Sequence, residues 1–348
     1  MKTIQSTISI LVIGLFAISM SFVSCSKSDD DSQSTLQDVY IGGHIVNSNY
    51  KWVATIWKNG VASYLTSGTT FSDINDITVA GNDVYAVGYE QITAKKIAKF
   101  WKNGVATDLS DGLKDEEAIA IAVVGNDVYV GGTQYDSKTS ITIAKVWKNG
   151  IATNLESANT NYSTDVPTSI HISGNDVYVS GFKGNGTESW AKFWKNGVAV
   201  NLTNGQTNAA VNDILVVGSD VYAVGRINYK AKCWKNNVLT SNLIIEEGSY
   251  EAKRIVSEGS DIYILGYDNS VNSTSQIRIW KNGSVINSPN PLENVMPEDI
   301  AISGVDNYVC GTLKSGNKNY AVYYKNQVRT DLVTDATIAS YAKAIFVK

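Results

Sequence analysis

A pattern of three short segments recurs seven times between Asp38 and the last residue, and it constrains the fold more than any other feature of the sequence. An apolar run ends at a turn such as Gly81-Asn82-Asp83. The second run has tyrosine two residues and glycine five residues after that aspartate, and the third ends in Trp-Lys-Asn-Gly or a variant. The residues that mark the third run are Trp57, Trp101, Trp147, Trp194, Trp234, Trp280 and Tyr324. A repeat of roughly 45 residues that contains only strands predicts the blades of a β-propeller.

The turns and the composition of the runs favour strands over helices. Asn-Gly between two apolar runs is a strong hairpin signal, because both central residues of a type I′ turn adopt positive φ. The runs are rich in Val, Ile and Tyr, which suit a half-buried pleated surface. The chain has only 4 prolines, which fits interior strands that need every backbone N–H for the sheet.

The two ends of the repeat region complement each other. The first run of each copy has isoleucine four residues before its turn glycine, and Ile345 supplies this position once more at the C-terminus. The segment that begins at Asp38 enters the pattern at its second run. We therefore expect an all-β, seven-bladed β-propeller over residues 37–348. It would have four antiparallel strands per blade and be closed by a composite blade of N- and C-terminal strands.

The N-terminal residues lie outside the expected fold. Residues 1–24 have the features of a signal peptide: Lys2, and then an apolar stretch from Ile8 to Val23 that is too short and Ser-rich to be a confident membrane span. Residues 25–36 are polar and acidic, as is typical of a solvated tether.

The end of this segment resembles a known processing signal. Phe22-Val23-Ser24-Cys25 is similar to the lipobox of bacterial lipoproteins, although Leu is usual at the first position. The resemblance implies that Cys25 is acylated, for example with palmitate, and becomes a membrane anchor. Asp29-Asp30-Asp31 looks like the acidic tract that directs some Gram-negative lipoproteins to the cell surface. We expect a surface-exposed outer-membrane lipoprotein; a periplasm-facing location and an ordinary signal peptide are the alternatives.

The repeat itself resembles kelch-type propellers. A tyrosine-containing run that ends in Gly42-Gly43 or Gly131-Gly132 is followed by a tryptophan in the next run. The resemblance covers the whole repeat region, but the other five copies lack the double glycine. The chain is thus similar to kelch-like repeat lipoproteins of Gram-negative bacteria, many of which have no assigned activity.

Residues suited to metal binding or nucleophilic catalysis are few. The chain has 2 histidines, His44 and His171, on different copies, whereas catalytic zinc and copper sites usually use two or three close together. We expect no metal and no cofactor. The carboxylate runs Asp115–Glu117 and Glu246-Glu247 fall in expected loops, which favours solvated charges. A glycosidase pair depends on spatial separation, so a carbohydrate-active enzyme stays open.

Composition limits the partners. The net charge is −4 and no basic stripe occurs, which makes nucleic acid an unsuitable partner. Cys233 and Cys310 lie a whole blade apart, so we expect small core residues and no disulfide. We expect a monomer.

The aromatic residues that recur in every copy are predicted to lie in the core, with the OH or N–H satisfied locally. The turn aspartates are predicted to cap tight turns. Functional residues should therefore lie where the copies differ.

Variation concentrates on one face, which carries the second-to-third loops and the blade crossovers, whereas the tight turns are expected on the other. Loops on a rigid scaffold often carry binding, and three aligned positions vary on this long-loop face. The residues after the repeated glycine include His44, Tyr89, Phe182, Arg226 and Tyr267. Those five before the turn glycine include Asp76, Asp213, Arg254 and Asp299. Those near the start of the third run include Trp52, Trp190, Tyr229 and Tyr320.

Exposed aromatic and charged side chains of this kind suit a glycan or a protein ligand. We expect a non-catalytic binding module on the cell envelope that recognises a surface glycan or a protein through the long-loop face. The alternatives are a carbohydrate-active enzyme with carboxylates at the channel mouth and a structural scaffold.

Overall fold

The computed structural model describes residues 37–155, 164–205, 208–244, 250–271, 274–286, 293–333, 335 and 337–348. Every regular element in these residues is a β-strand, and they contain no helix long and apolar enough to cross a membrane. The predicted signal peptide, tether, acidic tract and lipidation residue Cys25 lie outside the described residues, as does Glu246-Glu247.

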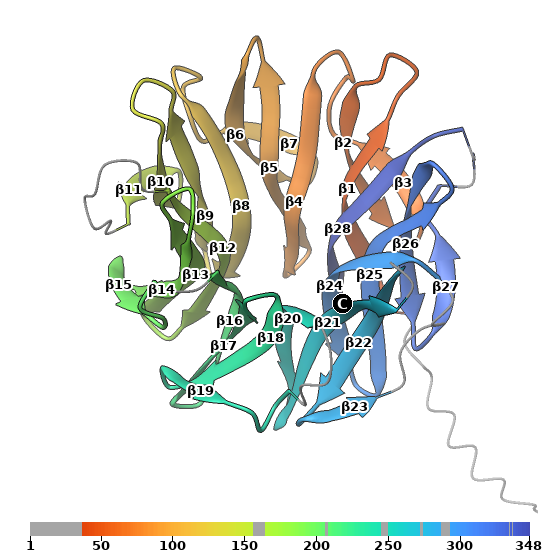
Figure 1. Cartoon of the computed structure of the whole chain (residues 1–348). Coiled ribbons are helices and arrows are strands. Elements are labelled where there is room, and N and C mark those ends of the chain that lie inside the picture. Colours follow the sequence, from red (N-terminus) through yellow and green to blue (C-terminus); the bar gives the residue numbers. More distant parts are fainter. Residues whose placement is uncertain are drawn as a thin grey trace, which may run out of the picture. The chain divides into compact units, whose positions relative to one another are not determined.

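The strands take four successive positions, which we number from the centre of the fold outwards (Figure 1). The first strands are β4 (Phe71–Ala80), β8 (Asp115–Val124), β12 (Thr164–Ser173), β16 (Ala209–Val217), β20 (Tyr250–Glu258), β24 (Val295–Ser303) and β28 (Ser340–Val347). The second strands are β1 (Val39–Val46), β5 (Asp83–Ile92), β9 (Asp127–Asp136), β13 (Asp176–Gly184), β17 (Asp220–Ile227), β21 (Asp261–Val271) and β25 (Asp306–Ser315). The third strands are β2 (Trp52–Lys58), β6 (Lys95–Lys102), β10 (Ile141–Lys148), β14 (Ser189–Lys195), β18 (Lys230–Lys235), β22 (Thr274–Lys281) and β26 (Lys318–Lys325). The fourth strands are β3 (Val61–Tyr64), β7 (Val105–Asp108), β11 (Ile151–Asn154), β15 (Val198–Asn201), β19 (Val238–Thr240), β23 (Ser284–Ile286) and β27 (Val328–Asp331).

Hydrogen bonds join the strands into five four-stranded sheets and one eight-stranded sheet. The eight-stranded sheet contains two antiparallel groups, β8–β11 and β12–β15, linked through the parallel pair Thr142 and Thr164. In the sheet β28-β1-β2-β3 the C-terminal strand pairs antiparallel with the N-terminal one, with Ile345 opposite Ile41. First strands contact one another in the order β4, β8, β12, β16, β20, β24 and β28, and β28 contacts β4. The chain therefore has an all-β, propeller-like fold.

Side chains join the turn between the third and fourth strands of each group to an aspartate at the start of the second strand. In six groups this aspartate directly follows the turn between the first and second strands, and in the group β28-β1-β2-β3 it is Asp38, just before β1. In one group Asn103 Nδ2 donates to Asp83 Oδ1 (2.7 Å), Lys102 Nζ lies 2.7 Å from Asp83 Oδ2, and Asn103 Oδ1 accepts a hydrogen bond from the Val84 N–H (2.8 Å). The same Asp–Asn and Asp–Lys contacts recur at Asp38, Asp127, Asp176, Asp220, Asp261 and Asp306. The turn aspartates thus hold the neighbouring hairpin, beyond the predicted capping of their own turn, and this explains the repeated Lys-Asn.

The predicted core is confirmed. The marker tryptophans and Tyr324 are buried, and Cys233 and Cys310 are buried free thiols. The prediction that the indole N–H groups are satisfied is wrong for three of them. Within the described part of the chain, Nε1 of Trp57, Trp101 and Trp147 makes no hydrogen bond, because these rings pack among apolar side chains of their own group and of the preceding group.

Tight turns occur on both faces, contrary to the prediction. On the long-loop face β5 and β6 are separated by two residues, as are β17 and β18 and also β25 and β26. Asn228 and Tyr229 in the second of these turns both have positive φ (50° and 61°), as a type I′ turn requires.

Candidate functional site

Every first strand contains a β-bulge at the same place. In β4 the register against the second strand shifts at Asn75. The residues skipped at the aligned shifts are Ile119, Thr168, Asn212, Lys253, Glu298 and Lys343. A bulge leaves one residue unpaired and re-aims its side chain.

The repeated glycine is what accommodates the bulge. A Cβ added to Gly88 would lie 1.9 Å from the carbonyl oxygen of Asp73, two residues before the bulge residue Asn75. The corresponding glycine in the next group, Gly132, would place a Cβ 2.1 Å from the Glu117 carbonyl oxygen. Any larger residue would push the two strands apart at this point.

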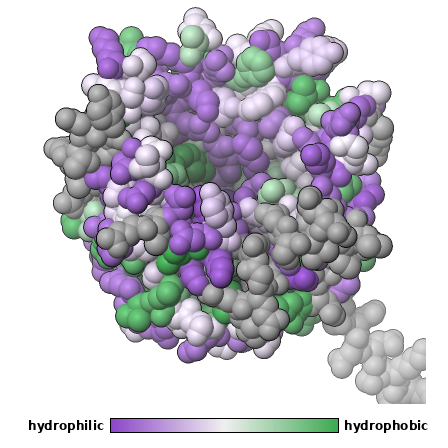
Figure 2. Space-filling view, in the orientation of Figure 1, coloured by the Kyte–Doolittle hydropathy of each residue, from purple (hydrophilic) through white to green (hydrophobic). Residues whose placement is uncertain are grey.

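The bulges surround a cavity of ≈ 390 Å³, which we call the central pocket. All seven first strands contribute to its lining. The lining residues are Asn75, Glu117, Ile119, Val166, Pro167, Thr168, Asn212, Glu251, Lys253, Arg254, Glu298 and Lys343. Figure 2 shows a hollow at the centre of the sheets that is bordered mainly by hydrophilic residues.

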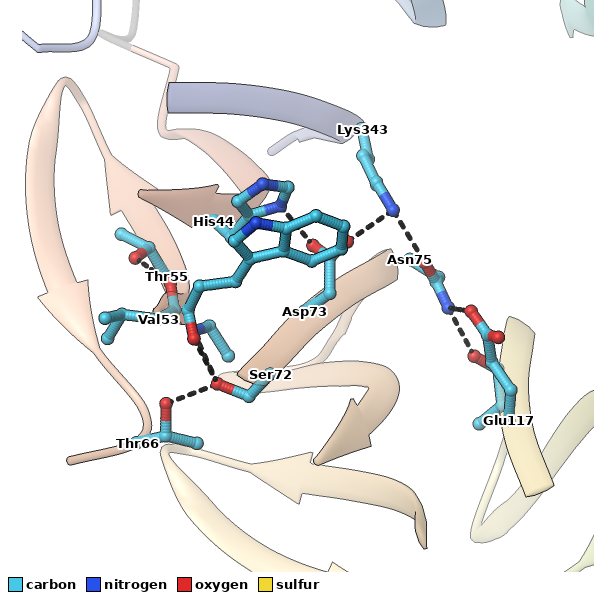
Figure 3. Close-up of polar contacts among 12 residues, drawn as sticks. His44, Val53, Thr55, Thr66, Ser72, Asp73, Asn75, Glu117 and Lys343 are labelled. Carbon is cyan, nitrogen blue, oxygen red and sulfur yellow. Dashed lines mark hydrogen bonds and ion pairs between the residues drawn. The ribbon is translucent and has the colours of Figure 1, made fainter. Parts of the chain in front are cut away.

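Lys343 is held in place by a buried carboxylate (Figure 3). Its Nζ donates to Asp73 Oδ2 and to Asn75 Oδ1 (3.1 Å). Asp73 has 0% of its side chain exposed, and its other oxygen lies 2.8 Å from His44 Nδ1. Burial alone would raise the pKa of Asp73, but the contacts with His44 and Lys343 outweigh it and hold this pKa below its ordinary value. A buried, ionised group therefore fixes an ammonium group at the pocket.

The His44 ring is itself enclosed by aromatic rings. It stacks on Trp52 at 4.6 Å and on Tyr341 at 4.5 Å between ring centroids. Only 2% of His44 is exposed, and its Nε2 makes no hydrogen bond to any described residue. His44 thus orients Asp73 from inside the protein and does not face the pocket as a ligand contact.

Glu251 is fixed by three donors. Arg226 Nη1 lies 2.6 Å from Glu251 Oε1, Asn212 Nδ2 donates to the same oxygen (2.9 Å), and the Tyr267 OH donates to Oε2 (2.7 Å). Burial acts to raise the pKa of Glu251, but Arg226, Tyr267 and Asn212 together lower it.

The other two carboxylates of the pocket are also paired. Glu117 Oε1 accepts a hydrogen bond from Asn75 Nδ2 (2.8 Å), and Glu117 Oε2 lies 2.6 Å from Lys96 Nζ. Glu298 Oε2 lies 3.0 Å from Lys253 Nζ. All three glutamates therefore have a cation as partner.

The predicted aspartates below the pocket connect neighbouring first strands. Asp76 Oδ2 accepts a hydrogen bond from the N–H of Ile121 in β8 (2.8 Å). Asp213 and Asp299 accept equivalent bonds, each 2.9 Å long, from backbone N–H groups in β20 and β28. These three side chains are therefore placed to hold adjacent groups together.

The surroundings of Asp76, Asp299 and Arg254 shift the pKa values of these side chains. Burial, and next the charge of Asp299, raise the pKa of Asp76 to about 7. Burial raises the pKa of Asp299 to about 6, against the opposing effect of Arg254. The pKa of Arg254 is raised, because the nearby Asp299, Asp213 and Asp76 outweigh its burial.

The remaining predicted site residues are dispersed. Tyr89 and Tyr267 were expected to be exposed, and this is wrong: their exposed fractions are 4% and 8%. The reason is that each ring lies under a lysine, with Lys96 Nζ 4.2 Å from the Tyr89 centroid and Lys253 Nζ 5.8 Å from that of Tyr267.

Trp52 and Tyr229 are exposed, at 37% and 68%. Phe182, Trp190 and Tyr320 are partly buried. Among the predicted site residues, Arg254 lines the central pocket.

Sequence reasoning missed the bulge residues and the glutamates. Glu117 was expected in a solvated loop, but it belongs to β8, and its neighbour Glu116 is buried against Lys145 at 2.8 Å. The missed signal is the position six residues before the turn glycine, where the copies carry amide, aliphatic, hydroxyl, ammonium and carboxylate groups.

No arrangement suited to a metal ion is present in the described residues, where no group of three or more His, Cys, Asp and Glu side chains is placed to hold one. His171, the second histidine, lies in β12, and burial lowers its pKa.

No protein-family model matches the chain, and no curated protein matches it. A Trypanosoma rangeli sialidase in complex with sialic acid aligns with 83% of this chain and 57% of its own, at 8% identity and a TM-score of 0.48. A puromycin-hydrolyzing peptidase of Mycobacterium tuberculosis aligns with 76% of this chain and 46% of its own, at 12% identity and a TM-score of 0.48. The chain thus spans about half the length of these structures, and a likeness of this degree carries no argument about function.

Proposed function

We propose that the chain is a seven-bladed, kelch-like β-propeller, closed by the composite blade β28-β1-β2-β3. The support is that seven first strands each carry one bulge in register, and that β28 contacts β4 as well as β1. A shared blade leaves no unpaired edge between the two ends of the chain.

On this scaffold the chain acts as a non-catalytic binding module of the cell envelope. Its ligand, a surface glycan or a protein, is taken at the central pocket and the surrounding long-loop face. The observation that carries this proposal is the position of Lys343, held at the pocket by the fully buried Asp73. A buried charge is costly in a core, and placing polar groups in advance is what a binding site needs.

A lipid anchor completes the proposal. Acylation of Cys25 would hold the propeller at the outer membrane, exposed at the cell surface. One acyl chain alone gives marginal, reversible membrane binding. A stable anchor would therefore need Cys25 to carry more than one acyl chain. The membrane and one ligand are then the partners of a monomer that does not bind nucleic acid.

A carbohydrate-active enzyme is the second candidate, and the raised pKa values of Asp76 and Asp299 favour it. The hydrogen bonds of these residues argue for a structural role, since both oxygens of each accept backbone N–H groups. All three pocket glutamates are paired with cations, and the lowered pKa of Glu251 makes this residue unsuited to act as a general acid. A structural scaffold predicts a flat face without a pocket, so the cavity counts against it.

The test is a glycan array together with a pull-down from cell-envelope extract, using the full-length chain in detergent. Lys343→Met and Glu298→Gln are compared with wild type, and Lys148→Met, at the exposed end of β10 on the tight-turn face, is the matched control. We expect a ligand that is lost in the two pocket variants and kept in the control. A ligand that binds all four proteins equally would place recognition elsewhere, and hydrolysis of an arrayed glycan would favour the enzyme.

A further inference from the structure

The central pocket has two unlike walls. Following the first strands around the pocket, β8 and β12 supply Ile119, Val166 and Pro167, whereas β20, β24 and β28 supply Lys253, Glu298 and Lys343. Asn75 and Asn212 lie between the walls, on β4 and β16. The first side also carries Glu117 and Thr168, so it is mainly aliphatic, whereas the opposite side is mainly charged.

The charged wall carries both signs next to each other. Lys253 pairs with Glu298 at 3.0 Å, and their side chains keep 21% and 31% exposure. Lys343 keeps 33% exposure although its ammonium group contacts Asp73. These groups can thus reach a ligand while their positions are held by protein contacts, so less ordering is needed on binding.

The aromatic groups needed to stack on sugar rings are poorly placed for this pocket. Tyr89 and Tyr267 are buried and covered by lysines, and the lining of the pocket contains no aromatic residue among those described. The lining instead combines carboxylate, ammonium and aliphatic groups.

We propose that the central pocket binds a small amino-acid-type zwitterion with an apolar side chain, either a free amino acid or a short peptide. Its carboxylate would lie beside Lys253 and Lys343, its ammonium group beside Glu298, and its side chain against Ile119 and Pro167. A cavity of ≈ 390 Å³ falls in the usual range for small-ligand sites, roughly 300–1,000 Å³. This inference rests on the proposed binding function and specifies its ligand.

The test is isothermal titration calorimetry, supported by saturation-transfer NMR, on the full-length chain in detergent. The probes are leucine, leucyl-leucine, glycyl-glycine, N-acetyl-leucyl-leucine amide and a neutral trisaccharide. We expect leucine or leucyl-leucine to bind, and the comparison of the two separates a free amino acid from a peptide. The capped peptide, which lacks charged ends, and glycyl-glycine, which lacks apolar side chains, should each bind at least about tenfold more weakly. This is the usual contribution of a charged hydrogen bond or of a buried aliphatic group.

The variants test the location. Lys343→Met and Glu298→Gln should each weaken binding of the preferred probe about tenfold or more, and Lys148→Met, on the tight-turn face, should leave it unchanged. Circular dichroism and melting confirm that each variant folds; should Lys343→Met fail to fold, Glu298→Gln and Ile119→Ser answer the same question.

The possible failures are distinguishable. If the capped peptide or the trisaccharide binds as well as leucyl-leucine, and this binding needs Lys343, the ligand class is wrong while the binding function stands. If none of the zwitterions binds, the inference is overturned. If the ligand found by the glycan array or the pull-down binds Lys343→Met and Glu298→Gln as tightly as wild type, the proposed function also fails.

Discussion

The guanidinium Nε of Arg254 lies 3.3 Å from Oδ1 of Asp299, and this contact joins β20 to β24 at the central pocket, which Arg254 lines. Arg254 also lies within the electrostatic reach of Asp213 and Asp76. A single arginine therefore offsets three carboxylates that come from three different first strands, β4, β16 and β24.

Replacing this arginine should destabilise the fold in a pH-dependent way. Arg254→Met leaves Asp76, Asp213 and Asp299 without their cation, and we expect a loss of about 1–3 kcal/mol in the free energy of unfolding at pH 8, below the full cost of a buried pair because the contact is partly solvated. The loss should be smaller at pH 5, where protonation removes the repulsion. Arg329→Met, which removes an exposed ion pair, should cost at most about 1 kcal/mol at either pH. Equal losses for both variants would contradict this role of Arg254.

The wild-type protein should lose stability as pH rises. The folded-state pKa values of Asp76 and Asp299, about 7 and about 6, lie above the value of 3.8 for an unperturbed aspartate. A raised pKa means that the folded state binds the proton more tightly, so this contribution is complete below pH 3.8 and is lost as pH rises through 6 and 7. Melting temperatures measured from pH 5 to pH 8 should therefore decline. Asp76→Ala, which copies Ala120 at the aligned position, should flatten the decline; an unchanged slope would speak against Asp76 as its source.

The C-terminal strand should be indispensable. A chain that lacks Tyr341–Lys348 loses the strand that pairs with β1, which exposes an edge and invites aggregation. We expect loss of the cooperative thermal transition or soluble aggregates in size-exclusion chromatography. A truncated monomer that melts cooperatively at the wild-type temperature would rule out the composite blade.

The proposed lipidation would depend on one residue, Cys25. Cys25→Ser should shift the protein from the membrane fraction to the soluble fraction and abolish labelling by radioactive palmitate in the producing bacterium. Cys233→Ser serves as the control, because this thiol is buried in the core. Wild-type protein that is soluble and unlabelled would end the lipoprotein proposal.

Replacing a recurring core tryptophan should lower the free energy of unfolding more than removing the hydroxyl group of Tyr267. Trp147→Ala creates a cavity in a fully buried site, so we expect a loss of about 3–5 kcal/mol. Tyr267→Phe keeps the ring and removes the hydrogen bond to Glu251, which should cost about 0.5–1.5 kcal/mol and weaken ligand binding. Urea denaturation measures both. A Tyr267→Phe protein with wild-type stability and affinity would show that the contact with Glu251 is dispensable.

The repeat pattern was sufficient to predict the strands, because hairpin turns and recurring core aromatics depend on local sequence. Trp147 and its counterparts are buried as expected. Glu117 was predicted in a loop because a run of charged residues is typical of loops. Its partner Lys96 lies in the preceding group of strands. The burial of Tyr89 likewise depends on the position of Lys96 above its ring, which alignment of the copies does not reveal.

The pocket itself was missed because simple alternation assigns neighbouring residues such as Asn75 and Asp76 to opposite faces of a strand. The bulge in β4 breaks this alternation. The repeated glycine, Gly88 in this case, marks the bulge in the sequence, so the signal was present in a residue that could be taken for a simple strand glycine.

The bulge residues have a consequence for how such a chain can diversify. Each of them has no partner residue opposite it in the second strand. Its side chain is therefore not restricted by cross-strand pairing as the rest of the strand is. Ile119 and Lys253 occupy equivalent places with opposite chemistry. The lining of the central pocket is therefore modular: its seven bulge residues can be exchanged one at a time, by mutation or by design, while the core stays the same.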